Sequence, residues 1–80
     1  MNIEHMVQMA NDIAGFFDGE YQGAAAADAV ATHLKRYWVP VMRKQIVAHI
    51  ESGPGGLEPT AYAAVQKLAQ EQRESDMPRV

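Results

Sequence analysis

The sequence contains no cysteine, so disulfide bonds, thiolate zinc sites and cysteine-ligated iron–sulfur clusters are absent from this chain. Its three histidines, His5, His33 and His49, do not form the H-x3-H spacing of a helical metal-binding pair. In a chain of 80 residues, a single apolar core rarely contributes more than about 3–5 kcal/mol of net stability. We therefore expect a protein partner to supply further stabilisation, with a bare helical bundle as the alternative.

Positive charge is also scarce, because the net charge is −3, and this argues against general nucleic-acid binding. No run approaches the roughly 20 apolar residues that span a bilayer. The first residues include Asn2, Glu4 and His5 and lack the basic and apolar regions of a secretory signal. The sequence therefore predicts a cytoplasmic protein that binds neither nucleic acid nor membrane.

Apolar residues recur with helical spacing over residues 3–17, which predicts the first helix. Asn2 is placed to cap its N-terminus. Met9 and Phe16 are expected to widen the apolar stripe, and Gly19 to end the helix in a left-handed conformation. The stripe itself consists of Ile3, Met6, Val7, Ala10, Ile13, Ala14 and Phe17.

A second helix is expected over residues 23–38, where alanines allow the first helix to approach closely. Pro40 then disfavours the helical conformation at Val39 and cannot donate to the carbonyl four residues back. We expect a break there, followed by a third helix over residues 40–51, rather than one kinked helix. Val39 is expected to join the apolar stripe of the third helix. The buried stripe of the second helix is expected to contain Ala27, Val30, Ala31, Leu34 and Trp38.

The glycine-rich stretch 52–56 predicts a loop, and Pro59 opens a fourth helix over residues 59–72. Strand alternation and internal repeats are absent from the sequence. The predicted fold class is therefore all-α, a small single-domain helical bundle of three to four helices with a break or kink at Pro40. The helical domain covers residues 1–69, and residues 70–80 are expected to form a polar, partly mobile tail.

The central stretch 33–44 contains the single tryptophan and four of the seven Lys and Arg residues. One interpretation is a core aromatic surrounded by solvated charges. The other is a protein interface, because Trp and Arg are favoured anchors of interfaces. Composition alone does not separate the two. Under the second interpretation, the partner-binding residues are Lys35, Arg36, Tyr37, Trp38, Pro40, Met42 and Arg43.

No combination of residues in the sequence suggests catalysis. The acidic residues are dispersed, and no serine, histidine and acid group suggests nucleophilic chemistry. The glycines of stretch 53–56 lack the Lys-Ser/Thr that completes a phosphate-binding loop, and they follow helical sequence instead of a strand. We therefore expect no catalytic, cofactor-binding or metal-binding residue in this chain, and no enzyme activity from the chain by itself.

Three stretches resemble the delta subunit of NAD-dependent formate dehydrogenase. Residues 33–43 resemble the family's H-L-x-R-F/Y-W-x-P-x-M-R signature, and residues 9–17 resemble its M-A-N-x-I-x-x-F-F stretch. The run Gly56-Leu57-Glu58-Pro59, followed by Ala63-Ala64, is similar to its G-L-x-P segment. The matches occur in the family's order. Val39 and Val41 depart from the polar residues expected on either side of the proline.

The resemblance implies an accessory subunit of a cytoplasmic formate dehydrogenase. In that family the large catalytic subunit carries a molybdenum or tungsten pterin cofactor and iron–sulfur clusters. Other subunits carry flavin and further clusters and pass electrons to NAD. The delta subunit is expected to bind no cofactor, to contact these subunits, and to support assembly, cofactor insertion or stability of the complex. Permanent subunit and maturation chaperone both stay open, as does self-association.

The alternative function is a small helical regulator that binds nucleic acid through the basic segment Lys35–Lys44. Its support is the absence of any acidic residue between Asp28 and Glu51. The acidic total charge of the chain stands against it.

Overall fold

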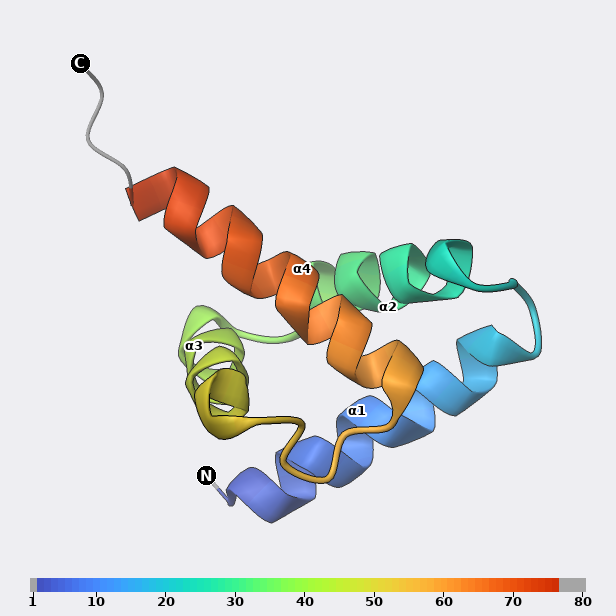
Figure 1. The fold of residues 1–80 in the computed structure, drawn as a ribbon, viewed down its shortest axis with the longest axis horizontal. Helices are drawn as coiled ribbons and strands as arrows, with labels where there is room; N and C mark the ends of the chain where they lie inside the picture. Colours follow the sequence, from blue (N-terminus) through green and yellow to red (C-terminus); the bar gives the residue numbers. More distant parts are fainter. Residues whose placement is uncertain (1, 77–80) are drawn as a thin grey trace.

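The computed structural model describes residues 2–76 as four α-helices joined by short connections (Figure 1). Within this range there is no strand, which confirms the all-α prediction. The last helix reaches Asp76, past its expected end at residue 72. Residues 77–80, the end of the tail expected to be mobile, lie outside the described residues. The elements are α1 (Ile3–Asp18), α2 (Ala24–Tyr37), α3 (Pro40–His49), the 3₁₀ turn η1 (Ile50–Ser52) and α4 (Pro59–Asp76).

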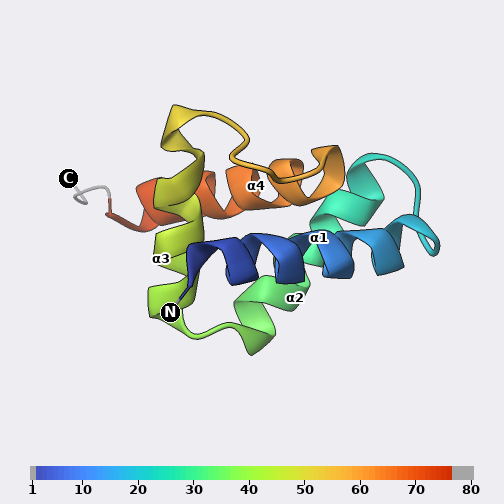
Figure 2. The same cartoon turned by 90° about the horizontal axis from the view of Figure 1, so that it is seen from below.

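Helices α1, α2 and α4 pack against one another, and α3 contacts both α1 and α4. In Figure 2, α3 runs across the neighbouring helices instead of alongside them. The chain that follows α3 returns over α1 to reach the start of α4 (Figure 1). The change of direction between α2 and α3 therefore places α3 across α1 and α4.

All four helices contribute a large side chain to the centre of the core. Met6 comes from α1, Val30 and Leu34 from α2, Ile46 from α3 and Val65 from α4, and each is fully buried. Alanines fill the helix contacts around them and allow the backbones to approach closely. These are Ala10, Ala14, Ala26, Ala27, Ala31, Ala61 and Ala64, none more than 4% exposed. The buried stripe predicted for the second helix is confirmed at every position.

Three local expectations are wrong. Phe16 is 66% exposed, because one residue of helix turns it about 100° away from Phe17 and the buried stripe. Val39 is 53% exposed, because it lies in the extended link before α3 and does not share that helix's apolar face. Gly19 has φ −76° and remains right-handed, and the connection between α1 and α2 takes its positive φ, +55°, at Gly23, just before α2 begins.

The loop before α4 is fixed to two other helices by side-chain hydrogen bonds. Asn11 Nδ2 donates to the Gly56 carbonyl over 3.0 Å, and the Glu58 N–H donates to Asn11 Oδ1 over 2.8 Å. His49 Nε2 lies 2.8 Å from the Gly55 carbonyl oxygen. Gly55 has φ +59°, and a Cβ there would lie 2.2 Å from His49 Nε2, so any other residue would strain the backbone and displace the His49 ring. The start of α4 is therefore positioned by α1 and α3 together.

Candidate protein-binding surface

The helix break at Pro40 shapes the central stretch. Trp38, with ψ 136°, and Val39, with φ −70° and ψ 155°, are extended, and Pro40 occupies the first turn of α3. A residue that precedes proline is pushed toward extended conformations, which explains Val39. The preferred prediction of a break instead of a kink is confirmed. The chain consequently changes direction between α2 and α3.

Arg43 holds this break in place. Its Nη1 donates to the Lys35 carbonyl over 3.1 Å and also to the Trp38 carbonyl. Carbonyls at the C-terminal end of a helix lack partners within the helix, and a basic side chain can satisfy them. Arg43 is one of the predicted partner contacts, and within this chain its guanidinium bonds to the backbone at the end of α2.

Trp38 and Met42 belong to the core. They are 5% and 8% exposed, and with fully buried Leu34 they continue one apolar line at four-residue spacing across the break. Burying a tryptophan ring of roughly 200 Å² contributes up to about 5 kcal/mol to folding. Of the two interpretations of this stretch, the structure places these two residues as the core interpretation expects.

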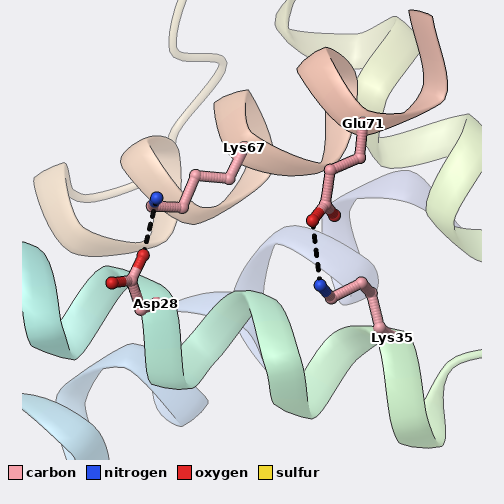
Figure 3. Close-up of polar contacts among 4 residues, drawn as sticks. All are labelled: Asp28, Lys35, Lys67 and Glu71. Carbon is pink, nitrogen blue, oxygen red and sulfur yellow. Dashed lines mark hydrogen bonds and ion pairs between the residues drawn. The ribbon is translucent and has the colours of Figure 1, made fainter. Parts of the chain in front are cut away.

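Lys35 is engaged by α4. Its Nζ lies 3.0 Å from Glu71 Oε1, and Lys67 Nζ lies 2.6 Å from Asp28 Oδ1, with all four side chains 45–60% exposed (Figure 3). The hydrogen bond with Asp28, followed by the negative charge of that carboxylate, raises the pKa of Lys67. The two pairs have opposite polarity, so sliding α4 along α2 would place like charges together. They therefore favour one register of α2 against α4.

The remaining predicted contacts, Arg36, Tyr37 and Pro40, are exposed, Tyr37 by 68%. The Tyr37 ring lies 4.7 Å from the His33 ring between centroids, and His33 lies 5.9 Å from Phe17. Phe17 in turn lies 5.3 Å from Phe16 and 6.1 Å from Tyr21. These rings form one continuous row from the end of α1 to the end of α2. We call it the aromatic surface, defined as Phe16, Phe17, Tyr21, His33 and Tyr37.

An open groove of about 510 Å³ runs along the aromatic surface. Arg36 lines it beside Tyr37, so the groove combines rings with a guanidinium. Of the aromatic surface, sequence reasoning proposed only Tyr37 as a contact and missed the other four rings, Phe16, Phe17, Tyr21 and His33. The available signal was four-residue spacing, which puts Tyr21 one turn from Phe17 and Tyr37 one turn from His33. The groove is lined by Phe17, Tyr21, Ala25, Asp28, Ala29, Thr32, His33, Arg36 and Tyr37.

A metal centre and a membrane span are the other kinds of site to consider in the part of the chain that the structure describes. There, no group of three or more His, Asp or Glu residues is arranged to hold a metal ion. In the same part, none of the helices has the length and apolar character needed to cross a bilayer. His33 packs against aromatic rings and His49 bonds to the Gly55 carbonyl, so the structure gives each a local packing role.

Comparison with known proteins gives a single kind of match. No curated protein and no solved structure matches the chain. The family model described as "NADH-dependant formate dehydrogenase delta subunit FdsD" matches residues 5–65. This span exceeds half of the chain and takes in α2, α3 and all five residues of the aromatic surface. The chain therefore belongs to the formate dehydrogenase delta subunit family.

Proposed function

We propose that this chain is a non-catalytic accessory subunit that binds the formate dehydrogenase complex. There it supports assembly, insertion of the molybdenum or tungsten cofactor, or stability of the complex. Membership of the delta subunit family is the observation that carries this proposal. The large catalytic subunit and other subunits are the partners, and the cofactors belong to them: the pterin metal centre, iron–sulfur clusters, flavin and NAD.

The exposed rings give the proposal physical support. Phe16, Tyr21 and Tyr37 are 66%, 48% and 68% exposed, although the fold buries apolar side chains from all four helices in its core. Single exposed apolar residues are ordinary, but a contiguous apolar patch with polar neighbours is typical of a protein-binding site. Aromatic residues and arginine are also enriched in such sites.

The nucleic-acid alternative loses support from the same geometry. Of the four cations in the segment Lys35–Lys44, Lys35 pairs with Glu71 and Arg43 bonds to backbone carbonyls. Over residues 2–74, this leaves Arg36 and Lys44 outside any ion pair. Two available cations on a chain of net charge −3 are few for a backbone of phosphates. We therefore retain the accessory subunit as the proposed function.

A deletion strain tests the proposal directly. The tagged wild-type chain is returned to this strain, and the proteins that copurify with it are identified. We expect the large subunit of formate dehydrogenase among them, and a lower metal content or fewer intact complexes in the strain without the chain. Failure of the tagged chain to retain any subunit, together with normal metal content in its absence, would overturn the proposal.

The amount of this chain in the purified complex distinguishes a permanent subunit from a maturation chaperone. The amount of this chain in purified, active enzyme is measured against the large subunit. Equal amounts identify a permanent subunit. A trace amount, combined with metal-poor enzyme from the deletion strain, identifies a maturation chaperone. The isolated chain is assayed alongside, and we expect no formate-dependent reduction of NAD from it.

A further inference from the structure

Three rings of the aromatic surface, Phe16, Tyr21 and Tyr37, offer exposed apolar area that the fold itself does not bury. The rings of this surface lie next to one another, with centroid distances of 4.7–6.1 Å, and all of them except Phe16 line a groove open to solvent. Covering such rings with an aliphatic or proline side chain removes apolar area from water on both sides of the contact. The groove therefore suits an apolar segment of a partner.

The charge that the groove presents to a partner depends on which of its charged side chains are already in ion pairs. Asp28, the one carboxylate among the described residues that line it, is bound by Lys67 at 2.6 Å. Lys35, next to Arg36 in sequence, is bound by Glu71 at 3.0 Å. Over residues 2–74, no ion pair includes Arg36. The charge left available in the groove is thus the Arg36 guanidinium, whose planar array of donors complements a carboxylate.

We infer that the aromatic surface and Arg36 form the docking site for an acidic, apolar segment of a formate dehydrogenase subunit. An aliphatic or proline side chain of that segment lies against the rings of Phe17, His33 and Tyr37, and a neighbouring Asp or Glu binds Arg36. This inference rests on the proposed function, because the segment belongs to the complex. It moves the contact from the predicted Trp38, Met42 and Arg43 to the exposed side of α2 and the end of α1.

A second copy of this chain fits the groove less well. In a symmetric dimer the same patch meets itself, so each Arg36 would approach a surface whose lining carboxylate, Asp28, is already neutralised by Lys67. Rings would be covered, but both guanidinium groups would lack a carboxylate. Charge complementarity therefore favours a different, acidic partner over self-association.

Affinity of variants for the complex tests the site. The double variant Phe16→Ser/Tyr37→Ser removes two exposed rings, one beside the groove and one that lines it, and Arg36→Glu reverses the charge of the groove. We call these two the groove variants. Arg73→Glu is the matched charge control, because Arg73 is an exposed arginine that lines a different groove, between α3 and α4. Val41→Ser is the matched apolar control, because Val41 is 59% exposed and outside the aromatic surface. Purified variants are titrated against complex from the deletion strain, and their circular dichroism and melting are recorded.

We expect each groove variant to bind the complex about tenfold or more weakly than the wild type, with both controls near the wild-type affinity. The loss for Arg36→Glu is expected to shrink as salt is raised, because an ion pair is screened. Wild-type affinity in both groove variants would overturn the docking site and leave the proposed function intact. Absence of binding by the wild-type chain would instead overturn the proposed function.

Cross-linking identifies the occupant. A photoreactive phenylalanine analogue is placed at position 37 of the full chain, the complex is illuminated, and cross-linked peptides are sequenced. We expect a peptide from a formate dehydrogenase subunit in which an Asp or Glu adjoins aliphatic residues or proline. A cross-link to a second copy of this chain, or to a subunit segment without an acidic residue, would overturn the inference. Stronger binding of a single-stranded oligonucleotide than of the complex would overturn it as well.

Discussion

One face of α2 is buried in the core, and the opposite face is open to solvent. On the inner face, Val30, Ala31 and Leu34 are buried against the other helices. On the outer face, His33 and Tyr37 carry rings that the fold leaves at a groove open to solvent. One side of the helix therefore packs in the core, and the other side carries rings of the proposed docking site. Adjacent residues of the stretch 33–43 therefore lie on different faces: His33 lines the groove, and Leu34 is buried in the core.

The cations of the central stretch divide in the same way. Lys35 and Arg43 are bound inside the molecule, to Glu71 and to backbone carbonyls, whereas Arg36 faces the groove. The family signature contains Arg36 and Arg43, and these two arginines differ in what they contact. Matched substitutions on the two faces can therefore separate stability from binding.

The largest expected effect is on the inner face, from Trp38→Ala. Removing a ring that is only 5% exposed should cost about 3–5 kcal/mol, most of the stability that a core of this size supplies. We expect the isolated variant to be largely unfolded by circular dichroism, with Trp38→Phe intermediate. A cooperative urea transition at the wild-type midpoint for Trp38→Ala would show that the inner face does not depend on this ring.

Next in size is the loss of the bonds that Arg43 makes across the helix break. Arg43→Met keeps the apolar stem but leaves the Lys35 and Trp38 carbonyls to water, and should cost about 1.5 kcal/mol. Arg43→Lys should recover only part, because an ammonium lacks the planar array of donors. The urea midpoint measures both. Arg36→Met is the control, and an equal loss in that variant would contradict the distinction between the two arginines.

A smaller effect is expected at the contact of α2 with α4. Because the pKa of Lys67 is raised in the folded chain, the pair with Asp28 stabilises the fold fully below pH 10.5, the ordinary pKa of lysine. This contribution is lost as the pH rises through the raised value. The difference in urea midpoint between wild type and Lys67→Gln should stay constant up to about pH 10 and shrink above it. A difference that persists unchanged at pH 12 would argue against the ion pair.

The smallest effect on stability is expected on the outer face. Phe16→Ser and Tyr37→Ser alter side chains that are 66% and 68% exposed, so each should change the free energy of unfolding by no more than about 0.5 kcal/mol. Thermal melting and urea titration measure this. A loss above about 1 kcal/mol would mean that these rings serve the fold, and would remove the contrast between the two faces of α2.

The helical periodicity of the sequence was sufficient to predict which residues of α2 are buried on its inner face. The spacing of Val30, Leu34 and Trp38 predicted burial, and the burial of all three follows from the helical repeat alone. Trp38 was nevertheless also a candidate contact, because composition favours tryptophan at interfaces. For this residue the periodic signal was the better guide. The position of Pro40 likewise fixed the break, through local sterics that need no knowledge of the rest of the fold.

The exposed rings and the groove on the outer face of α2 could not be predicted from local sequence, because they depend on how α1 and α2 pack together. Phe16 and Phe17 are adjacent and equally apolar, so composition could not decide which of the two the fold leaves exposed. The groove exists because the turn at Gly19–Gly23 sets the end of α1 beside α2. The role of Arg43 depends on the direction that α3 takes after the break. Both are tertiary features.

The bonds from Asn11 to Gly56 and Glu58 join positions 45 and 47 residues apart. α4 also supplies Ala61, Ala64, Val65 and Leu68 to the core. During synthesis on the ribosome, the first three helices must therefore wait with their apolar faces uncovered until the last third of the chain emerges. A nascent chain halted before α4 would be a target for chaperones and proteases, whatever the state of the enzyme that it joins.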